Sequence, residues 1–302
     1  MLRNRLPRNS RVWLPLVLAA CLSLAVRTPA LAAVNPNIWV ATCPADSGTS
    51  APGCGSFDSA PSGGQAPGFL AGQRSQPNYI VVQQDPWTGA AGRQTIHEQA
   101  CWHWQLAAAD KDPANAPGQV LTYPSVAVNY YQLDTAASGY TAPPPGYDLD
   151  HIASLTSFYN ESMPAATLAY QAHAAYDIWL NNWATEVMVW NHLHGQSRDL
   201  SVDGDTKVGT FRIGGQQWTL WDSIAPGQPA EDGYYAWVNS SDQTSGTVDL
   251  LAMLEVMVGK GFIPAASSLT QVSYGWEISD TGGKLLPGWA IGNFGVWIRD
   301  KS

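Results

Sequence analysis

Apolar and polar residues alternate in short runs along most of the chain, and Gly, Pro, Asn and Asp separate these runs. A period of two is typical of β-strands buried on one face, because successive side chains point to opposite sides of a sheet. Strands are predicted over 79–83, 101–106, 125–131, 165–173, 175–180, 185–190, 208–213, 217–221, 234–239, 271–279 and 290–299. Many short strands without interleaved helices predict an all-β protein, either a two-sheet sandwich or a jelly roll.

One segment follows the helical period instead. Between 248 and 258, apolar residues recur every three or four positions, at Leu250, Leu251, Leu254, Met257 and Val258. Thr247 is expected to cap this helix, and Pro264 lies just beyond its expected end. The sequence therefore predicts one short helix among the strands.

The composition agrees with a secreted β protein. Of the 302 residues, 13% are charged and 11% aromatic, with 14 Trp, 28 Gly and 21 Pro. Few charges and many turn formers favour a β-rich globular chain over a helical or disordered one. The formal net charge is −9. Since an acidic chain repels phosphate, nucleic acids and anionic membranes are not expected partners.

The first 33 residues have the features of a secretory signal peptide. Arginines precede the apolar run 12–26, and Ala30-Leu31-Ala32 provides a small-x-small cleavage site. The run is too short to span a bilayer, which takes about 20 residues, and no later segment is long enough. We expect secretion into the extracellular space. Lipid anchoring through Cys21, which follows a lipobox-like Leu-Ala-Ala, is the alternative.

Two further parts are expected after the leader. Residues 34–76 are rich in Ser, Gly and Pro and are expected to form loops, and residues 77–302 form the strand-rich domain. Cys43 and Cys54 flank one such loop, so an exported chain is expected to join them as a disulfide, which leaves Cys101 odd. No Cys or His spacing of a zinc site occurs, and neither a metal nor a cofactor is expected.

Two predicted strands place acidic and aromatic side chains together. A two-residue turn at 182–183 would set Trp179 opposite Glu186 and Asp177 opposite Met188. One face of the pair then carries Asp177, Trp179, Glu186, Met188 and Trp190. Asp177 would lie diagonal to Glu186, within side-chain reach. Carboxylates beside indoles are unusual for a solvent-exposed sheet face, so this face is a candidate site.

A third acid, Glu277, lies on a strand of similar pattern. Within 271–279, apolar residues form one face, with Trp276 directed inward, and Glu277 lies on the other. Its small neighbours Ser273, Gly275 and Ser279 are expected to leave open space, as in a substrate groove. An exposed strand glutamate is the alternative.

Indoles and paired carboxylates suit glycan cleavage. Indole rings stack on the C–H faces of sugars, and a pair of carboxylic acids is the usual apparatus for breaking a glycosidic bond. One ionised carboxylate attacks the anomeric carbon, and one protonated acid gives its proton to the leaving oxygen. Carboxyl groups about 5 Å apart retain configuration, and a wider separation inverts it.

Several segments, in this order, resemble glycoside hydrolase family 12, the compact β-jelly-roll endoglucanases. YDIW at 176–179 resembles the family's YDxW strand, EVMVW at 186–190 its ExMxW nucleophile strand, and YGWEI at 274–278 its acid/base strand. YPSV at 123–126 resembles its YPxV segment, and Trp87 follows a strand as a family Trp does. The resemblance covers roughly residues 77–302.

The resemblance implies an antiparallel two-sheet jelly roll with a concave glycan-binding cleft. It implies that Glu186 is the nucleophile, that Glu277 is the general acid/base and that Asp177 tunes the nucleophile. The family retains configuration through a covalent glycosyl-enzyme. Trp87, Trp179, Met188 and Trp190 are the implied substrate-binding residues.

The chain departs from the family in substrate-facing regions. Gln83-Gln84-Asp85-Pro86-Trp87 stands where the family has an Asn-Asn/Glu-x-Trp stretch, and Thr95 stands where it has a cysteine. Trp104, two positions after Trp102, is added to the predicted sugar-binding residues. His192 and His194 share a strand face, and we expect a surface or groove-rim role for them rather than metal binding.

The sequence therefore predicts a secreted, monomeric, retaining endo-β-1,4-glucanase of cellulose-like or mixed-linkage glucan. A xyloglucan-preferring hydrolase is the nearest alternative. A catalytically weak glycan-binding protein and a purely structural surface protein are alternatives from other classes.

Overall fold

The structure is a computed structural model. It describes the backbone of residues 56–59, 79–83, 94–100, 103–109, 120–130, 133–134, 139–140, 147–223 and 233–301. Side chains are described for 104–106, 120–130, 147–223 and 233–301. The predicted leader, the Cys43–Cys54 disulfide and Trp87 lie outside the described residues.

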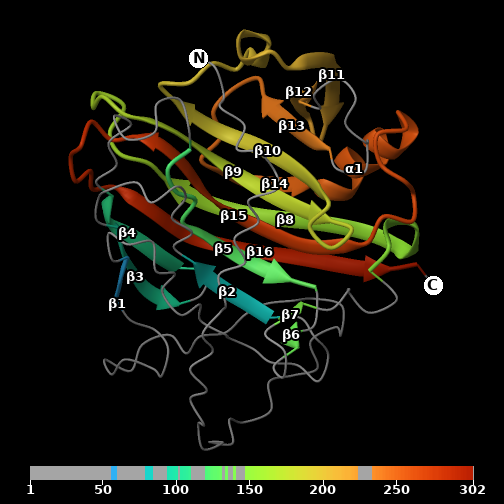
Figure 1. Cartoon of the computed structure of the whole chain (residues 1–302), viewed down its shortest axis with the longest axis horizontal. Coiled ribbons are helices and arrows are strands. Elements are labelled where there is room, and N and C mark those ends of the chain that lie inside the picture. The colour runs from blue at the N-terminus through green and yellow to red at the C-terminus, as the bar shows by residue number, and fades with distance from the viewer. Residues whose placement is uncertain are drawn as a thin grey trace, which may run out of the picture.

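Two large β-sheets make up the described structure (Figure 1). The larger sheet has eight strands in the order β11-β12-β13-β10-β9-β15-β5-β2. These strands are β2 (Tyr79–Gln83), β5 (Ser125–Asn129), β9 (Gln171–Leu180), β10 (Thr185–His194), β11 (Thr206–Ile213), β12 (Gln216–Asp222), β13 (Tyr234–Asn239) and β15 (Leu269–Asp280). Strands β10 and β13 pair in parallel, and the other neighbours in this sheet pair antiparallel.

The smaller sheet has six strands in the order β1-β3-β4-β16-β8-β14, all antiparallel. They are β1 (Ser56–Ser59), β3 (Gln94–Ala100), β4 (His103–Ala109), β8 (Ile152–Ser162), β14 (Ser245–Asp249) and β16 (Trp289–Asp300). The remaining elements are the hairpin β6 (Leu133–Asp134) and β7 (Gly139–Tyr140), the 3-10 helices η2 (Leu149–His151) and η3 (Leu200–Asp203), and the α-helix α1 (Leu250–Gly259).

Alternation along the strands divides the large sheet between two apolar clusters. Tyr176, Ile178 and Val187 are fully buried in the main core, which also contains residues of the smaller sheet. Met188 and Trp190, on the opposite face, belong to a second cluster. Period-two alternation places such neighbours on opposite faces of a sheet. Two sheets, with one α-helix among the described residues, confirm the predicted all-β sandwich.

Some element boundaries differ from those predicted. Strands β2 and β13 have the predicted ends, but 165–170 is a turn and loop, and β9 begins at Gln171. Strand β8 was not predicted, because its inner positions include the polar residues Ser157 and Glu161, which interrupt the apolar alternation. Strand β1 lies within the segment expected to form only loops, and it pairs with β3.

The helix begins two residues later than its predicted cap implies. Thr247 lies in β14, and Asp249 is the N-cap, with its side chain accepting a hydrogen bond from the backbone N–H of Ala252 at 3.1 Å. An Asp cap satisfies a donor that the first helical turn leaves unpaired. In the described part of the chain, no helix is long and apolar enough to cross a membrane.

Candidate active site

The hairpin of β9 and β10 carries the acidic and aromatic side chains that were predicted to share a face. Trp179 lies opposite Glu186 and Asp177 opposite Met188, so the predicted register is confirmed. Asp177 is therefore diagonal to Glu186 across the two strands. This face points away from the main core, and we call it the site face. On these two strands it comprises Ala175, Asp177, Trp179, Glu186, Met188 and Trp190.

The hairpin turn is wider than predicted. Leu180 and Thr185 pair with each other, so four residues rather than two connect the strands. Asn181, Asn182 and Trp183 have φ angles of 54°, 55° and 72°. The left-handed region is tolerated by Asn but costly for a bulky residue such as Trp. Strain of this kind persists only where the surrounding contacts hold it in place.

Hydrogen bonds anchor this turn to the start of β15. The Asn181 side chain accepts from the backbone N–H of Ser268 at 3.0 Å and donates to Ser267 Oγ at 3.2 Å. The backbone N–H of Asn182 donates to Thr270 Oγ1 at 2.9 Å. These contacts tie β9, β10 and β15 together at the end where Glu186 lies.

Asp177 and Trp179 form a polar pair beside Glu186. Asp177 is 6% exposed, and its Oδ2 accepts a hydrogen bond from Trp179 Nε1 at 2.8 Å. The indole of Trp179 is partly exposed, and its ring centroid lies 5.5 Å from that of Trp183 in the turn. Two adjacent indoles beside a carboxylate provide an aromatic surface on which a sugar ring can stack.

Glu277 lies on β15, directly opposite His173 of β9. It is 4% exposed, and its Oε2 lies 2.7 Å from Nε2 of His173. The sequence predicted open space around Glu277, and this prediction was wrong at Gly275. A Cβ on Gly275 would meet the Pro124 carbonyl oxygen at 2.1 Å, because the backbone of Pro124 and of Ser125 in β5 occupies this space.

The three acids share one face across adjacent strands. Strand β9 lies between β10 and β15, so Glu186 and Glu277 flank it on its two sides. Glu186 is level with Trp179, and Glu277 is level with His173. The stretch of β9 between these levels presents Asp177 on the same face. The two glutamates are offset by six residues along β9, about 20 Å at 3.3 Å per residue, so they share a face without lying level with each other.

No protein-family model and no curated protein matches the chain. A metagenome-derived family 12 endoglucanase superposes with TM-score 0.60 and 18% identity over 82% of this chain and 98% of that one. The xyloglucanase domain of a type three effector from Sinorhizobium fredii gives TM-score 0.59 and 23% identity over 80% and 99%. An endoglucanase from Rhodothermus marinus gives 0.58 and 21% over 74% and 92%. The chain has the fold of the family 12 glycoside hydrolases.

Within this family 12 fold, Met188 and Trp190 are covered rather than exposed. They lie on the predicted face, but they are only 1% and 2% exposed. Both pack in the second apolar cluster, with residues that include Leu200 of η3, Trp221 of β12 and Val238 of β13. Their side chains are therefore packed rather than open to a substrate, which disagrees with their predicted substrate-binding role.

Trp104 was predicted to bind sugar, and this prediction was wrong. It is fully buried in the main core, where its ring meets Trp276 edge to face at a centroid distance of 5.1 Å. Along β4, Trp104 and Leu106 point inward and Gln105 outward, so the alternation places this indole between the sheets.

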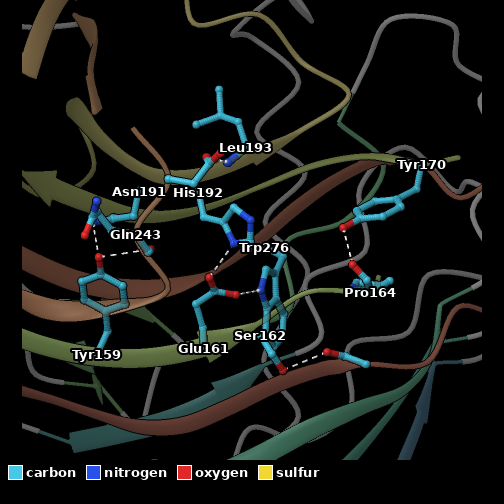
Figure 2. Close-up of polar contacts among 12 residues, drawn as sticks. Tyr159, Glu161, Ser162, Pro164, Tyr170, Asn191, His192, Leu193, Gln243 and Trp276 are labelled. Atoms are coloured by element: carbon cyan, nitrogen blue, oxygen red, sulfur yellow. Dashed lines mark hydrogen bonds and ion pairs between the residues drawn. The ribbon is translucent and has the colours of Figure 1, made fainter. Parts of the chain in front are cut away.

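His192 points inward and is only partly exposed, whereas a surface or groove-rim position was expected. A register shift between Trp190 and His192 makes Asn191 an extra residue, and a bulge of this kind reverses the faces of the residues that follow. His192 therefore points toward the smaller sheet, where its Nδ1 lies 2.8 Å from Glu161 Oε1. Figure 2 shows Glu161 between His192 and Trp276, whose Nε1 donates to Glu161 Oε2 at 3.2 Å.

The charge of Glu161 governs the titration of His192. Burial alone would lower the pKa of His192. The hydrogen bond and negative charge of Glu161, together with the charge of Asp242, outweigh burial and the opposing charge of Arg198. The pKa of His192 is therefore raised above 6.5.

The two histidines that share a sequence pattern take separate partners. His194 Nε2 lies 3.0 Å from the Leu168 carbonyl oxygen, and the ring stacks on Tyr170. Among the described residues, one group of metal-binding residue types has ligand atoms that all lie within 4.8 Å of one another. It consists of Asp148, just before η2, and of Asp150 and His151 in η2. None of the three lies on the site face.

Sequence reasoning missed three residues of this region. His173 lies against Glu277, Gln196 lies against His173, and Trp183 lies beside Trp179. A tryptophan in a short hairpin turn beside a predicted acidic strand was the available signal for Trp183. The contacts of His173 depend on the pairing of β9 with β15, which lies about a hundred residues further along the chain.

Proposed function

We propose that the protein is a retaining glycoside hydrolase that cleaves internal β-1,4-glucosidic bonds of a cellulose-like or mixed-linkage glucan. The observation that carries this proposal is the placement of Glu186 and Glu277 on strands that flank β9, with both acids on one face. The fold supports it, since similar structures are described as endoglucanases and xyloglucanases.

In the first step, Glu186 is the nucleophile and Glu277 the acid. The Glu186 carboxylate forms a bond to the anomeric carbon as the glycosidic C–O bond breaks. The proton of Glu277 moves to the departing oxygen, so the leaving sugar departs as a neutral alcohol. Asp177, diagonal to Glu186, adds a second negative group near the developing positive charge of the ring.

In the second step, Glu277 acts as a base. It takes a proton from water while the water oxygen attacks the anomeric carbon, and the ester bond to Glu186 breaks. Two inversions give net retention, and both carboxyl groups return to their starting states. The partly exposed indoles of Trp179 and Trp183 would hold the sugar rings, and the chemistry requires no cofactor.

Isosteric substitution of the two acids tests the proposal. Glu186→Gln and Glu277→Gln should each reduce the release of reducing ends from barley glucan by about 10²-fold or more, because each removes one half of the acid–nucleophile pair. Glu255→Gln is the matched control, since Glu255 is an exposed residue of α1, and it should keep wild-type activity.

Near-wild-type activity in either Glu186→Gln or Glu277→Gln, with folding verified by circular dichroism, would reject the assignment. Binding of glucan without new reducing ends in the wild type would favour the glycan-binding alternative. Absence of both binding and cleavage would favour a structural protein. Retention itself is tested by proton NMR of the first product, which should be the β-anomer.

The preferred glucan is tested on a panel of polysaccharides. Barley glucan, carboxymethyl cellulose, xyloglucan and xylan present the same protein with different backbones and branches. We expect the highest rate on an unbranched glucan. A clear preference for xyloglucan would support the alternative that the Sinorhizobium fredii xyloglucanase domain suggests.

We also propose that the protein is exported as a monomer after removal of residues 1–33. The mass of the purified product, together with its N-terminal sequence, tests the cleavage, and light scattering tests the oligomeric state. A lipid-modified N-terminus at Cys21 would show the anchored alternative.

A further inference from the structure

His173 connects the proposed acid to a second polar side chain. It is 1% exposed, its Nε2 lies 2.7 Å from Glu277 Oε2, and its Nδ1 lies 2.5 Å from Gln196 Oε1. The amide of Gln196 is oriented in turn, because its Nε2 donates to Ser279 Oγ at 3.3 Å. The four side chains form one continuous polar chain that ends at Glu277.

The imidazole ring is held in place by an aromatic contact. Its face stacks on the indole of Trp190, with centroids 3.8 Å apart and an interplanar angle of 27°. Trp190 is itself packed in the second apolar cluster. A buried ring that stacks on one face and is hydrogen-bonded at Nδ1 keeps one orientation toward Glu277.

The polar chain determines where protons lie. An amide oxygen only accepts, so Nδ1 of His173 carries the hydrogen that lies between it and Gln196. In the neutral ring, Nε2 then has a lone pair and no hydrogen. A lone pair 2.7 Å from a carboxylate oxygen is repulsive. A proton between the two atoms would relieve this repulsion, although Nε2 makes no hydrogen bond of normal geometry.

The groups that face the pair from neighbouring strands are acidic or uncharged. The titratable groups on the site face of β9 and β10 are Asp177 and Glu186, both acidic. Tyr123, beside β5, donates its hydroxyl to the Ala175 carbonyl oxygen at 3.0 Å and adds no charge.

We propose that His173 is a positioning residue that shares the catalytic proton with Glu277. This inference rests on the proposed function. In the first step the shared proton passes to the leaving oxygen, which leaves Glu277 as a carboxylate and His173 as a neutral ring. In the second step a proton from water returns to the pair as the water oxygen bonds to the anomeric carbon and the ester bond to Glu186 breaks.

The test is the pH dependence of kcat/KM in His173→Phe, with barley glucan as the substrate. Phenylalanine keeps the ring on Trp190 but has no nitrogen. The alkaline limb of the profile should move to lower pH by about 0.5–1 unit, because only the protonated pair is active. The matched control is His194→Phe, which also keeps a stacked ring, on Tyr170, and whose alkaline limb should not move.

A leaving-group comparison separates proton delivery from packing. An aryl cellobioside with a dinitrophenolate leaving group needs no proton for departure. Its first step in His173→Phe should stay within about 2-fold of wild type at a pH where the glucan rate falls about 10-fold or more. Equal losses on both substrates would show a structural role and overturn the proposal.

The outcomes distinguish this inference from the function on which it rests. If Glu277→Gln keeps its activity, the proposed function fails. If Glu277→Gln is inactive and His173→Phe has the wild-type profile, only the inference fails. If His173→Phe does not fold, Gln196→Leu decides, since it removes the acceptor at Nδ1 and keeps the imidazole. An unmoved alkaline limb in Gln196→Leu overturns the proposal.

Discussion

The pair of His192 and Glu161 makes the stability of the fold depend on pH. The Glu161 side chain has no exposed surface, and His192 is 21% exposed. The pKa of His192 is raised in the folded protein above the ordinary value of 6.5. The folded state therefore binds this proton more tightly than the unfolded state does. The stabilisation is complete below pH 6.5 and is lost as the pH rises through the folded value.

His192→Gln tests this dependence, because glutamine can still donate to Glu161 but does not titrate. The variant should cost about 1–3 kcal/mol of unfolding free energy at pH 5.5, and less at pH 8. The measurement is the thermal midpoint of wild type and variant at both pH values. His194→Gln is the control, because His194 contacts a backbone carbonyl rather than a carboxylate. A wild-type pH dependence in His192→Gln would contradict the assignment.

Residues were predictable from the sequence where their role depends on neighbours within one hairpin. Asp177 and Glu186 are nine positions apart, and a single turn fixes their register, so alternation alone placed them together. Alternation also placed Met188 and Trp190 correctly on this face. It could not show that η3 and β12 cover them, because that contact comes from residues further along the chain.

At the scale of the element, β15 is held against β5 without room for a side chain at Gly275. A Cβ there would lie 2.1 Å from the Pro124 carbonyl oxygen and 2.7 Å from Ser125 Cα, both of them backbone atoms that cannot rotate away. Gly275→Ala should destabilise the protein by about 1–3 kcal/mol, since the two strands must separate locally. Urea unfolding would measure the change.

The control for Gly275→Ala is Gly259→Ala, at the end of α1, where an added Cβ meets nothing within 4 Å. Alanine loses less backbone entropy than glycine on helix formation, so this variant should gain up to about 0.5–1 kcal/mol. Opposite signs for the two substitutions would confirm that packing at β15, and not the loss of glycine itself, causes the effect. Equal values would contradict the close approach of β5.

Elements with plain alternation were predictable, and those with a local exception were not. In the sequence, residues 186–194 continue one unbroken period-two pattern, so nothing marked Asn191 as a bulge. The bulge turns the side chain of His192 to the opposite face of the sheet, where it contacts Glu161. Strand β8 was not predicted because the acidic side chain of Glu161 points inward from it. The partners of Glu161, His192 and Trp276, lie on the other sheet.

At the scale of the whole molecule, the sandwich followed from many short alternating runs, but the order of the strands did not. Hairpin neighbours such as β9 and β10 can be paired from sequence spacing. The pairing of β15 with β9, and the parallel pairing of β10 with β13, join distant segments, and alternation is the same for any partner. These non-local pairings place Glu277 on the same face as Glu186.

The net charge of the molecule should separate anionic from neutral substrates. The formal charge is −9, and the charge of the predicted mature chain is −14, since all 24 acidic residues but only ten of the 15 basic ones follow residue 33. The chain therefore repels carboxymethyl cellulose and has no net attraction to uncharged hydroxyethyl cellulose. Salt screens this repulsion, because the Debye length falls from about 30 Å at 0.01 M to about 8 Å at 0.15 M.

Raising the ionic strength over this range should increase kcat/KM on carboxymethyl cellulose by about 2- to 10-fold, because encounter between like charges becomes faster. The same change should leave kcat/KM on hydroxyethyl cellulose nearly constant, since that polymer has the same backbone without the carboxylates. Reducing-end assays at pH 7 measure both rates. An equal response of the two polymers would show that salt acts on the enzyme itself. A decrease on the anionic polymer would place a basic surface at the binding site.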